Sequence, residues 1–354
     1  MAVTEPCYCT REDVKLAPDF AETARGNSRI DRAIQSVSRI IERELHRFFY
    51  PIDTTYYWDW PNFQYAAPWR LWVDQWDIVA LTGIESPPGT SISIADVLLY
   101  PPNRLPGWPY TRVELNRSTT AAWGPGATPQ QSIALTGTFG FTADTDSAGT
   151  LAAAVLDTDT AITVSDGSQM GVGDIVIAGT ERMIVSERAA VTTGLTQSGS
   201  GCSTASVADV ALATTGTGTV CIGEVILLDS ERMLVEDVTA GVVTVKRAWD
   251  GTVLATHTGA TVYAYRQLTV LRGQLGTAAA GYSSGTALSR HRVPGPVRDL
   301  AIAEAVNRVL QEVSGYARTV GEADALRPAP GMALTELWDE VTSAYGRRAR
   351  SRGV

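Results

Sequence analysis

The sequence is poor in the residues from which metal centres and catalytic triads are usually built. Its 354 residues include four cysteines and three histidines, and the histidines do not form the H-x-x-x-H or H-E-x-x-H spacing of a metal site. Cys7 and Cys9 are too close together for an ordinary structural zinc pair, and Cys202 and Cys221 have no cysteine or histidine near them in the sequence. We therefore expect free thiols in a reducing compartment, with no metal and no cofactor.

Long hydrophobic segments are missing as well. No apolar run is long enough to span a bilayer, and the first residues lack the basic and apolar regions of a signal peptide. Apolar residues make up 44% of the chain and charged residues 19%, which is typical of a globular protein and not of a disordered one. We expect a protein that is made and folded in a cytosol.

Lysine is scarce, and the charge balance is acidic. Lys15 and Lys246 are the two lysines among 29 basic residues, and the formal net charge is -9. Tight binding of nucleic acid needs a basic surface that neutralises phosphates. The sequence therefore argues against a high-affinity nucleic-acid binder, and we attribute the preference for arginine to a GC-rich genome.

A repeat is the most informative feature that is present. Residues 173–185 recur as residues 223–235 without a gap, and both copies contain Glu-Arg-Met. Each copy has branched apolar residues on both sides of a two-residue turn, at 179–180 or 229–230, which predicts a β-hairpin. A duplicated hairpin indicates a small β module that presents surface rather than performs chemistry.

A second repeat and a change in composition extend this module. Residues 245–252 and 270–277 share the pattern Val-x-Arg-x-x-x-Gly-Thr, and the whole stretch 143–289 is dominated by Thr, Ala, Gly, Val and Ser. The pattern predicts short strands with frequent turns, packed as a compact barrel or sandwich.

Helical periodicity marks both ends of the chain. Apolar residues recur at steps of three or four in residues 28–48, 296–313 and 334–345, and strand-like segments lie between 77 and 141. We predict an α+β fold in which residues 1–142 plus 290–354 form one helical core with antiparallel strands. An all-β domain with two repeats of about 50 residues, at 143–289, is predicted to interrupt this core.

One catalytic motif occurs, in an unsuitable context. Residues 281–285 match the G-x-S-x-G string with Ser283 at its centre, but that motif works only at a strand-to-helix corner. Here prolines follow soon after the segment, so we favour a turn. An esterase that uses Ser283 is kept as a third alternative.

Tryptophans crowd the segment between residues 56 and 76. They suit a platform on which bases or sugars stack, yet Arg70 is the one cation between residues 63 and 76. Packing in a core or at a subunit interface is therefore favoured. The candidate interface residues of this segment are Trp58, Trp60, Trp69 and Trp72.

The C-terminal helix leads directly into a basic tail. The helix carries Trp338 and Tyr345, and the tail is either a solvated end or an arm that orders against an acidic partner or DNA. We favour the arm and add both helix residues to the candidate interface. The tail contributes Arg347, Arg348, Arg350 and Arg352.

Several segments outside 143–289 resemble head-to-tail adaptor (connector) proteins of long-tailed bacteriophages. The resemblance covers about 200 residues, and the order of the segments is more specific than any one string. In that family the glycine-aromatic strand runs within a few residues into the next helix, whereas here 143–289 intervene. The similar segments are 8–15, 100–103, 109–116, 133–141, 293–313 and the end of the last helix at 345–348.

The resemblance implies a structural virion protein with no enzyme activity. It implies a homo-oligomeric ring, expected to be a dodecamer, that contacts the portal protein on one side and a head-to-tail stopper or tail protein on the other. DNA would pass through the lumen without sequence-specific binding, and an acidic wall suits that passage. The location implied is the virion neck, after assembly in the host cytoplasm. The alternative is a tail-tip, baseplate or fibre-associated protein whose Thr/Gly-rich module binds a glycan.

Overall fold

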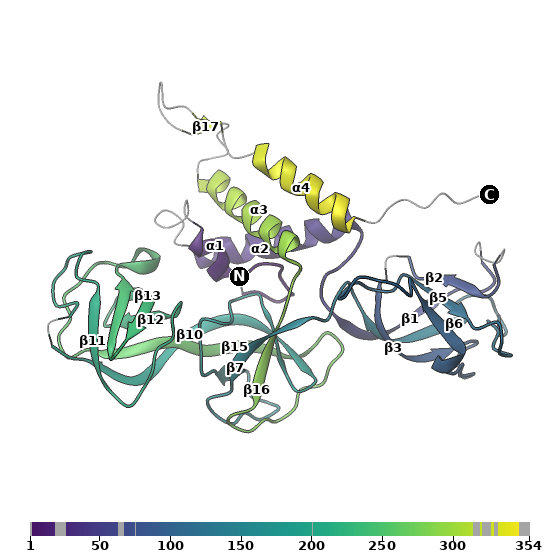
Figure 1. Cartoon of the computed structure of the whole chain (residues 1–354), viewed down its shortest axis with the longest axis horizontal. Helices are drawn as coiled ribbons and strands as arrows, with labels where there is room; N and C mark the ends of the chain where they lie inside the picture. Colours follow the sequence, from purple (N-terminus) through teal and green to yellow (C-terminus); the bar gives the residue numbers. More distant parts are fainter. Residues whose placement is uncertain are drawn as a thin grey trace.

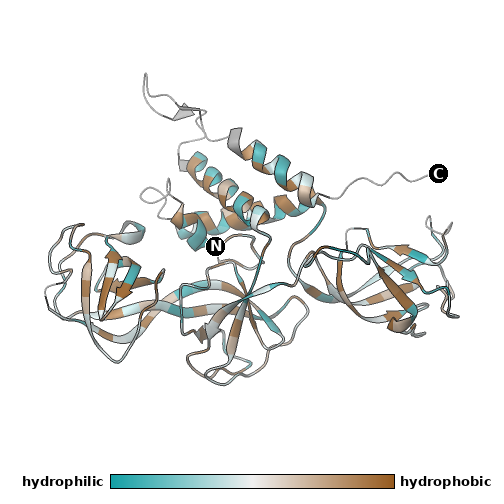
Figure 2. Ribbon diagram, in the orientation of Figure 1, coloured by the Kyte–Doolittle hydropathy of each residue, from teal (hydrophilic) through white to brown (hydrophobic). Residues whose placement is uncertain are grey.

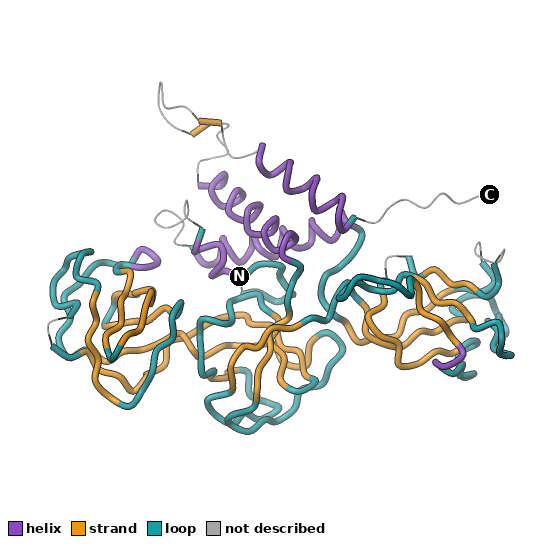
Figure 3. Tube along the Cα trace, in the orientation of Figure 1, coloured by secondary structure: helices purple, strands orange, loops and turns teal. Residues whose placement is uncertain are grey.

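The computed structural model describes residues 2–17, 26–62, 67–74, 76–199, 201–313, 319–320, 327–328 and 332–346. It is mostly β, with 36% strand and 20% helix. The predicted helical core with a β insert is therefore wrong as a fold class. The physical reason is that two of the three β bodies build cores of their own, and the helices share a core only with the central β body. Figures 1 and 3 show three β bodies in a row, with the helices grouped above the central one.

The described helices come from the two ends of the chain and pack together. They are α1 (Arg11–Leu16), α2 (Asn27–Leu45), α3 (Gly295–Val313) and α4 (Met332–Tyr345). Helix α2 buries one face, including Ile30, Ile34 and Ile41, as its periodicity predicts. Helix α3 contacts both α2 and α4, and an ion pair between Arg32 and Glu312 joins α2 to α3.

The first β body comprises residues 52–139 and contains two three-stranded antiparallel sheets. One has the order β1 (Ile52–Trp58), β6 (Ile133–Phe139), β3 (Ile78–Glu85). The other has the order β2 (Arg70–Trp72), β5 (Arg112–Leu115), β4 (Val97–Tyr100), and a short 3-10 helix, η2 (Ile94–Asp96), precedes β4. Leu71, Val113 and Phe139 are fully buried in a core that this body does not share with the helices.

Strands β7 to β16 form a ten-stranded sheet that closes into two modules. Its order is β7-β16-β9-β10-β11-β14-β13-β12-β15-β8, with a further pairing of β10 and β15. These two long strands run through both modules (Figure 1). Module A contains β7, β8, β9, β16 and the adjoining halves of β10 and β15, and module B contains β11 to β14 and the other halves. The bounds are β7 (Thr145–Thr150), β8 (Ala161–Thr163), β9 (Ile175–Ala178), β10 (Glu181–Gln197), β11 (Ala211–Gly216), β12 (Val225–Leu228), β13 (Glu231–Thr239), β14 (Val242–Lys246), β15 (Thr261–Gln274) and β16 (Ala287–His291).

The duplicated hairpins form as the repeat predicts. In module A, β9 pairs with β10 through Ala178 and Glu181, and in module B, β12 pairs with β13 through Leu228 and Glu231. Gly179 and Asp229 occupy the same turn position and both have a positive φ. The repeat in the sequence is thus a repeat in space.

The buried apolar residues divide between the two modules in an informative way. Val176, Ile184 and Leu268 of module A share one cluster with helices α1 to α4, whereas Leu212, Ile226 and Val262 of module B belong to a second cluster. Figure 2 shows apolar residues running through the strands of all three β bodies as well as the helices. Residues 143–289 therefore contribute to two cores, one of which they share with the helices.

Polar contacts on two sides of the first β body fix it against its neighbours. The Asp53 carboxylate pairs with Arg182 of module A at 2.9 Å, and its backbone N–H donates to the Leu275 carbonyl at 3.0 Å. On the helical side, Arg47 lies 2.9 Å from Asp77 and donates to the Tyr345 carbonyl at 2.8 Å.

Short elements complete the described chain: η3 (Trp249–Gly251), β17 (Thr319–Val320) and β18 (Arg327–Pro328).

Candidate functional site

Two of the candidate interface residues near the C-terminus, Trp338 and Tyr345, lie in the described part of the chain, and both pack against other residues of the protein. Trp338 and Tyr345 are partly buried against the core shared by the helices. The Tyr345 ring stacks on Trp108, with centroids 5.9 Å apart, and meets Phe141 edge-on. The four tail arginines, Arg347, Arg348, Arg350 and Arg352, lie outside the described residues, so their role in an interface stays a prediction.

The four tryptophans of the aromatic segment lie in the first β body and have different environments. Trp60 is 2% exposed and packs near Trp123, and Trp58 is partly buried near Tyr56. Trp69 and Trp72 are covered by guanidinium groups 4.7 and 4.6 Å from their rings, from Arg117 and Arg112. The local sequence did not reveal these cations because they come from beyond the segment.

Each module is built around a buried ion pair that the repeat supplies. In module A, Arg272 Nε lies 2.7 Å from Glu181 Oε1, and in module B, Arg247 Nε lies 2.7 Å from Glu231 Oε1. Both carboxylates are fully buried. Burial opposes ionisation of Glu231, but Arg247 and the backbone N–H groups of Ala255 and Ala248 outweigh it and lower its pKa to about 2.

The remaining bonds of these pairs show that they are structural. Arg272 donates to the carbonyls of Leu156 and Asp159, which brings a loop onto the hairpin. Arg247 donates in the same way to the carbonyls of Thr204 and Asp209. Because both guanidinium groups are saturated by the protein, they are not available to a substrate.

Ser283 lies in a turn, and His257 forms part of a buried charged cluster. The Ser283 carbonyl accepts a bond from the Thr286 hydroxyl at 2.8 Å within a turn, which matches the preferred reading of the G-x-S-x-G string. His257 is buried between Asp229 and Glu231, with ring nitrogens 2.7 and 3.0 Å from their carboxylates. It occupies the place in module B that Tyr282 occupies in module A.

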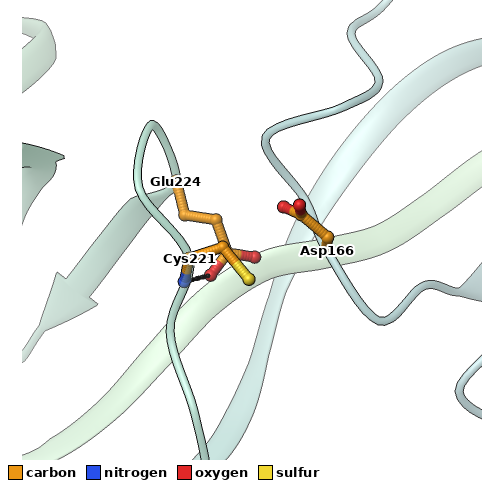
Figure 4. Close-up of side chains that lie close together, drawn as sticks. All are labelled: Asp166, Cys221 and Glu224. Carbon is orange, nitrogen blue, oxygen red and sulfur yellow. Dashed lines mark hydrogen bonds between the residues drawn. The ribbon is translucent and has the colours of Figure 1, made fainter. Parts of the chain in front are cut away.

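Asp166, Cys221 and Glu224 lie close enough together to suggest a metal site (Figure 4). The Glu224 carboxylate, however, accepts bonds from Arg266 Nε at 2.6 Å and from the backbone N–H groups of Gly167 and Cys221. Burial and the two carboxylates raise the pKa of the Cys221 thiol, which disfavours the thiolate that a metal requires. The cluster joins a loop of module A to a loop of module B.

A cleft of about 180 Å³ lies where α1 meets both modules. Six cationic and four anionic side chains line it, together with the rings of Trp249 and Tyr265. The cleft is thus net positive on a chain whose net charge is -9. Its charged lining residues are Arg11, Lys15, Arg188, Arg232, Arg290, Arg298, Glu12, Asp13, Glu187 and Asp250.

Ion pairs hold the walls of this cleft in place. Arg11 is 3% exposed and bridges Asp31 of α2, at 2.8 Å, to Glu187 of β10. Asp250 accepts from both Lys15, at 2.8 Å, and Arg232, so one carboxylate serves two cations. Sequence reasoning missed this site because its charged residues come from six separate parts of the chain, at 11–15, 187–188, 232, 250, 290 and 298. The one signal available was the Glu-Arg-Met string common to both repeats.

Comparison of the chain with protein-family models, with curated proteins and with solved structures finds no match. None of the described helices combines the length and apolar character needed to cross a membrane.

Proposed function

We propose that this protein is a structural subunit of a bacteriophage neck, a head-to-tail adaptor that assembles as a ring between the portal protein and the next ring towards the tail. It performs no chemistry in this role. The sequence resemblance gives the proposal its direction, and the arrangement of the described residues supports it.

The observation that carries the proposal is the way one helical group joins three β bodies. Helices from both ends of the chain pack together over module A, with the first β body and module B on either side (Figure 1). A subunit of this shape offers separate side faces to two neighbours, which a closed ring of identical subunits requires. The buried charged pairs are used to hold loops and modules together.

Exposed apolar residues on module B and the first β body supply candidate contact points. Val253 is 81% exposed, Val207 70% and Leu105 65%. Residues of this kind, far apart on the molecule, suit heterologous contacts, in which one patch meets a different patch on the next copy. The acidic net charge suits a channel wall that repels passing DNA.

The alternative is a glycan-binding protein of the tail tip or baseplate, and the large share of β structure is compatible with it. Three β bodies with exposed edges are also suited to a tail-tip or baseplate protein that binds a glycan. Trp69 and Trp72 would then be the aromatic platform, although guanidinium groups already cover the faces of both rings. This cover favours the adaptor.

Electron microscopy of the purified protein, alone and mixed with portal protein, tests the proposal. Closed rings, or rings that form only on portal, support the adaptor. A trimer that binds glycans and ignores portal would contradict it and support the alternative. Ester hydrolysis that Ser283→Ala abolishes would contradict both.

A further inference from the structure

We propose that copies of this protein bind each other head to tail, through two charge-matched surfaces at opposite ends of the molecule. One is the outer side of the sheet β2-β5-β4 in the first β body, which we call the aromatic face. The other is the tip of the hairpin β13–β14 in module B, residues 236–242, which we call the acidic tip. This contact rests on the proposed function, because it would be the lateral joint of the ring.

The aromatic face consists of two cross-strand rows that lie outside the core of the first β body. Side chains alternate between the two sides of a strand, and Leu71 and Val113 occupy the buried side. The rows on the opposite side are Tyr100, Arg112 and Trp72, and Leu98, Glu114 and Arg70. An exposed leucine beside two partly exposed aromatic rings is a surface suited to protein contact.

A positive charge is held in place at the centre of the aromatic face. The guanidinium of Arg112 lies 4.6 Å from the rings of both Trp72 and Tyr100, and its Nε lies 2.8 Å from Glu114 Oε1. Arg70 Nε lies 2.8 Å from the same oxygen. Two cations therefore share one carboxylate, which leaves the face with an excess of positive charge. Because the rings already hold the Arg112 side chain, it loses little conformational entropy when it meets an anion.

The acidic tip combines negative charge with exposed apolar residues. Glu236 and Asp237 are exposed, and no ion pair to either is found among the described residues. Val238 and Val242 are exposed as well, and a two-residue turn at 240–241 closes the hairpin. The tip thus offers two carboxylates and two valines, which complement the cations, the rings and the leucine of the aromatic face.

Comparison of the two modules places the acidic tip at the free end of the row of β bodies. By the two sequence repeats, the last pair before the turn, Thr239 and Val242, corresponds to Ala189 and Gln267 in module A. Beyond that pair β10 and β15 continue into module B, whereas β13 and β14 end. The tip therefore lies where a further module would begin, and the first β body lies on the other side of module A (Figure 1).

Two complementary surfaces at opposite ends of one chain make a heterologous contact. The tip of one copy binds the face of the next, and each copy keeps one free tip or face, so the contact repeats until a ring closes or a filament grows. The valines of the tip pack against Leu98 and the two rings. Its carboxylates bind Arg70 and Arg112 through charge-assisted hydrogen bonds.

Analytical ultracentrifugation of the full-length protein tests this contact. The face variant is Leu98→Ser/Arg112→Gln, in which Glu114 keeps the second arginine as its partner, and the tip variant is Glu236→Lys/Asp237→Lys. We expect the wild type to associate as its concentration rises. Each variant should raise the dissociation constant at least about thirtyfold, because Arg and buried apolar contacts dominate interfaces of this kind.

Two matched controls change exposed residues away from both surfaces. Tyr57→Ser alters the other sheet of the same β body, and Asp157→Lys reverses an exposed charge on module A. Both should associate like the wild type, since neither position lies on the aromatic face or the acidic tip.

Mixing the face variant with the tip variant separates loss of the contact from loss of the fold. The tip of the first variant and the face of the second are intact, so an equimolar mixture should form dimers with the wild-type affinity and no larger species. Circular dichroism of each variant checks its fold. Leu98→Ser alone replaces the face variant if the double substitution unfolds the protein.

Three results would overturn the contact. They are a wild type that stays monomeric up to about 1 mM, a face or tip variant that associates like the wild type, and a folded pair of variants that does not dimerise on mixing. A protein that is monomeric alone and forms rings on portal would overturn the contact and leave the adaptor function standing. A protein that associates through these surfaces and ignores portal would support the contact and contradict the adaptor.

Discussion

At the scale of single residues, the charged groups inside the two modules explain why the repeat retains Glu-Arg-Met. The glutamates Glu181 and Glu231 are fully buried and would be unfavourable there without Arg272 and Arg247. The sequence predicted the hairpins but not this role. The glutamates lie in the hairpin repeat, at 173–185 and 223–235, whereas the arginines lie in the separate Val-x-Arg repeat, at 245–252 and 270–277. Pairing the two repeats was the one available route to the site.

Removing one partner of the module B pair should therefore be costly. We expect Glu231→Gln to lower the free energy of unfolding by about 3 kcal/mol or more, because Arg247 is left as a buried charge without a counter-ion. Urea denaturation at neutral pH measures the effect. The double variant Glu231→Gln/Arg247→Met should be less destabilised than the single one, and equal losses would argue against the pair.

The same carboxylate makes stability depend on acidity. Its pKa is about 2 in the folded protein, below its ordinary value, so its contribution is complete above about pH 4.3 and is lost as the pH falls towards 2. Thermal melts between pH 2 and 6 should show a decline that Glu231→Gln lacks. A parallel decline in both proteins would contradict this assignment.

Asp174 should have the opposite effect. Burial raises its pKa to about 6, and nearby Asp13 adds to the rise against Arg290 and the Gly171 N–H. The folded protein therefore binds this proton more tightly than the unfolded chain does, and stability falls as the pH rises from about 4 to 6. We expect Asp174→Asn to stabilise the protein by about 2 kcal/mol at pH 7.5 and by almost nothing at pH 4. Thermal melts at the two pH values measure this, and a gain of equal size at both would contradict it.

At the scale of elements, periodicity predicted what each segment forms but not what it packs against. Helices α2 and α3 were expected from their apolar stripes and are present. Their partner was not predictable, since an apolar face does not specify its complement. Val172 and Ile222 occupy matching places in the two repeats, yet only the first is covered. The fold class was misjudged for a related reason, because short strands between turns carry a weak signal and were taken as additions to a helical core.

Gly171 tests the docking of the N-terminal segment. We expect Gly171→Ala to release residues 2–16 and to lower the free energy of unfolding by about 1–3 kcal/mol, because the new β-carbon collides with Thr10. Hydrogen exchange of this segment measures the release. Gly295→Ala is the control, because a β-carbon added at Gly295 has no neighbouring atom within 4 Å. Similar protection of residues 2–16 from exchange in both variants would contradict the close approach of Thr10 to Gly171.

At the scale of the whole molecule, three cores are joined by a few shared elements. The expected core of residues 1–142 plus 290–354 does include contacts between helices from the two ends. Module A shares the same buried cluster, whereas module B and the first β body have their own. Sequence reasoning found the repeats but had no means of seeing that the two copies belong to different cores.

This division predicts which part can be removed. Thr192 of β10 pairs with Tyr263 of β15, so an Asn-Gly turn joining these two residues would delete most of module B and leave module A closed. We expect the shortened protein to keep its helical circular dichroism. Deletion of residues 143–289 should abolish that signal, because nearly half of the buried cluster that they share with the helices disappears. Loss of helicity in the shorter deletion, or its survival in the longer one, would contradict the division.

The pairing of β10 with β15 across both modules has a mechanical consequence. Because both strands continue from one module into the other, a load that draws the modules apart along them is carried by two backbones in parallel, which the hydrogen bonds between the strands hold together. The ladder changes register between Ala189 and Val191, where β15 passes from its pairing with β8 of module A to its pairing with β12 of module B, so a bulge in the paired strands sets the bend at the joint. We expect β10 and β15 to move together under force, so that a displacement of module B is transmitted through module A to the helices packed on it.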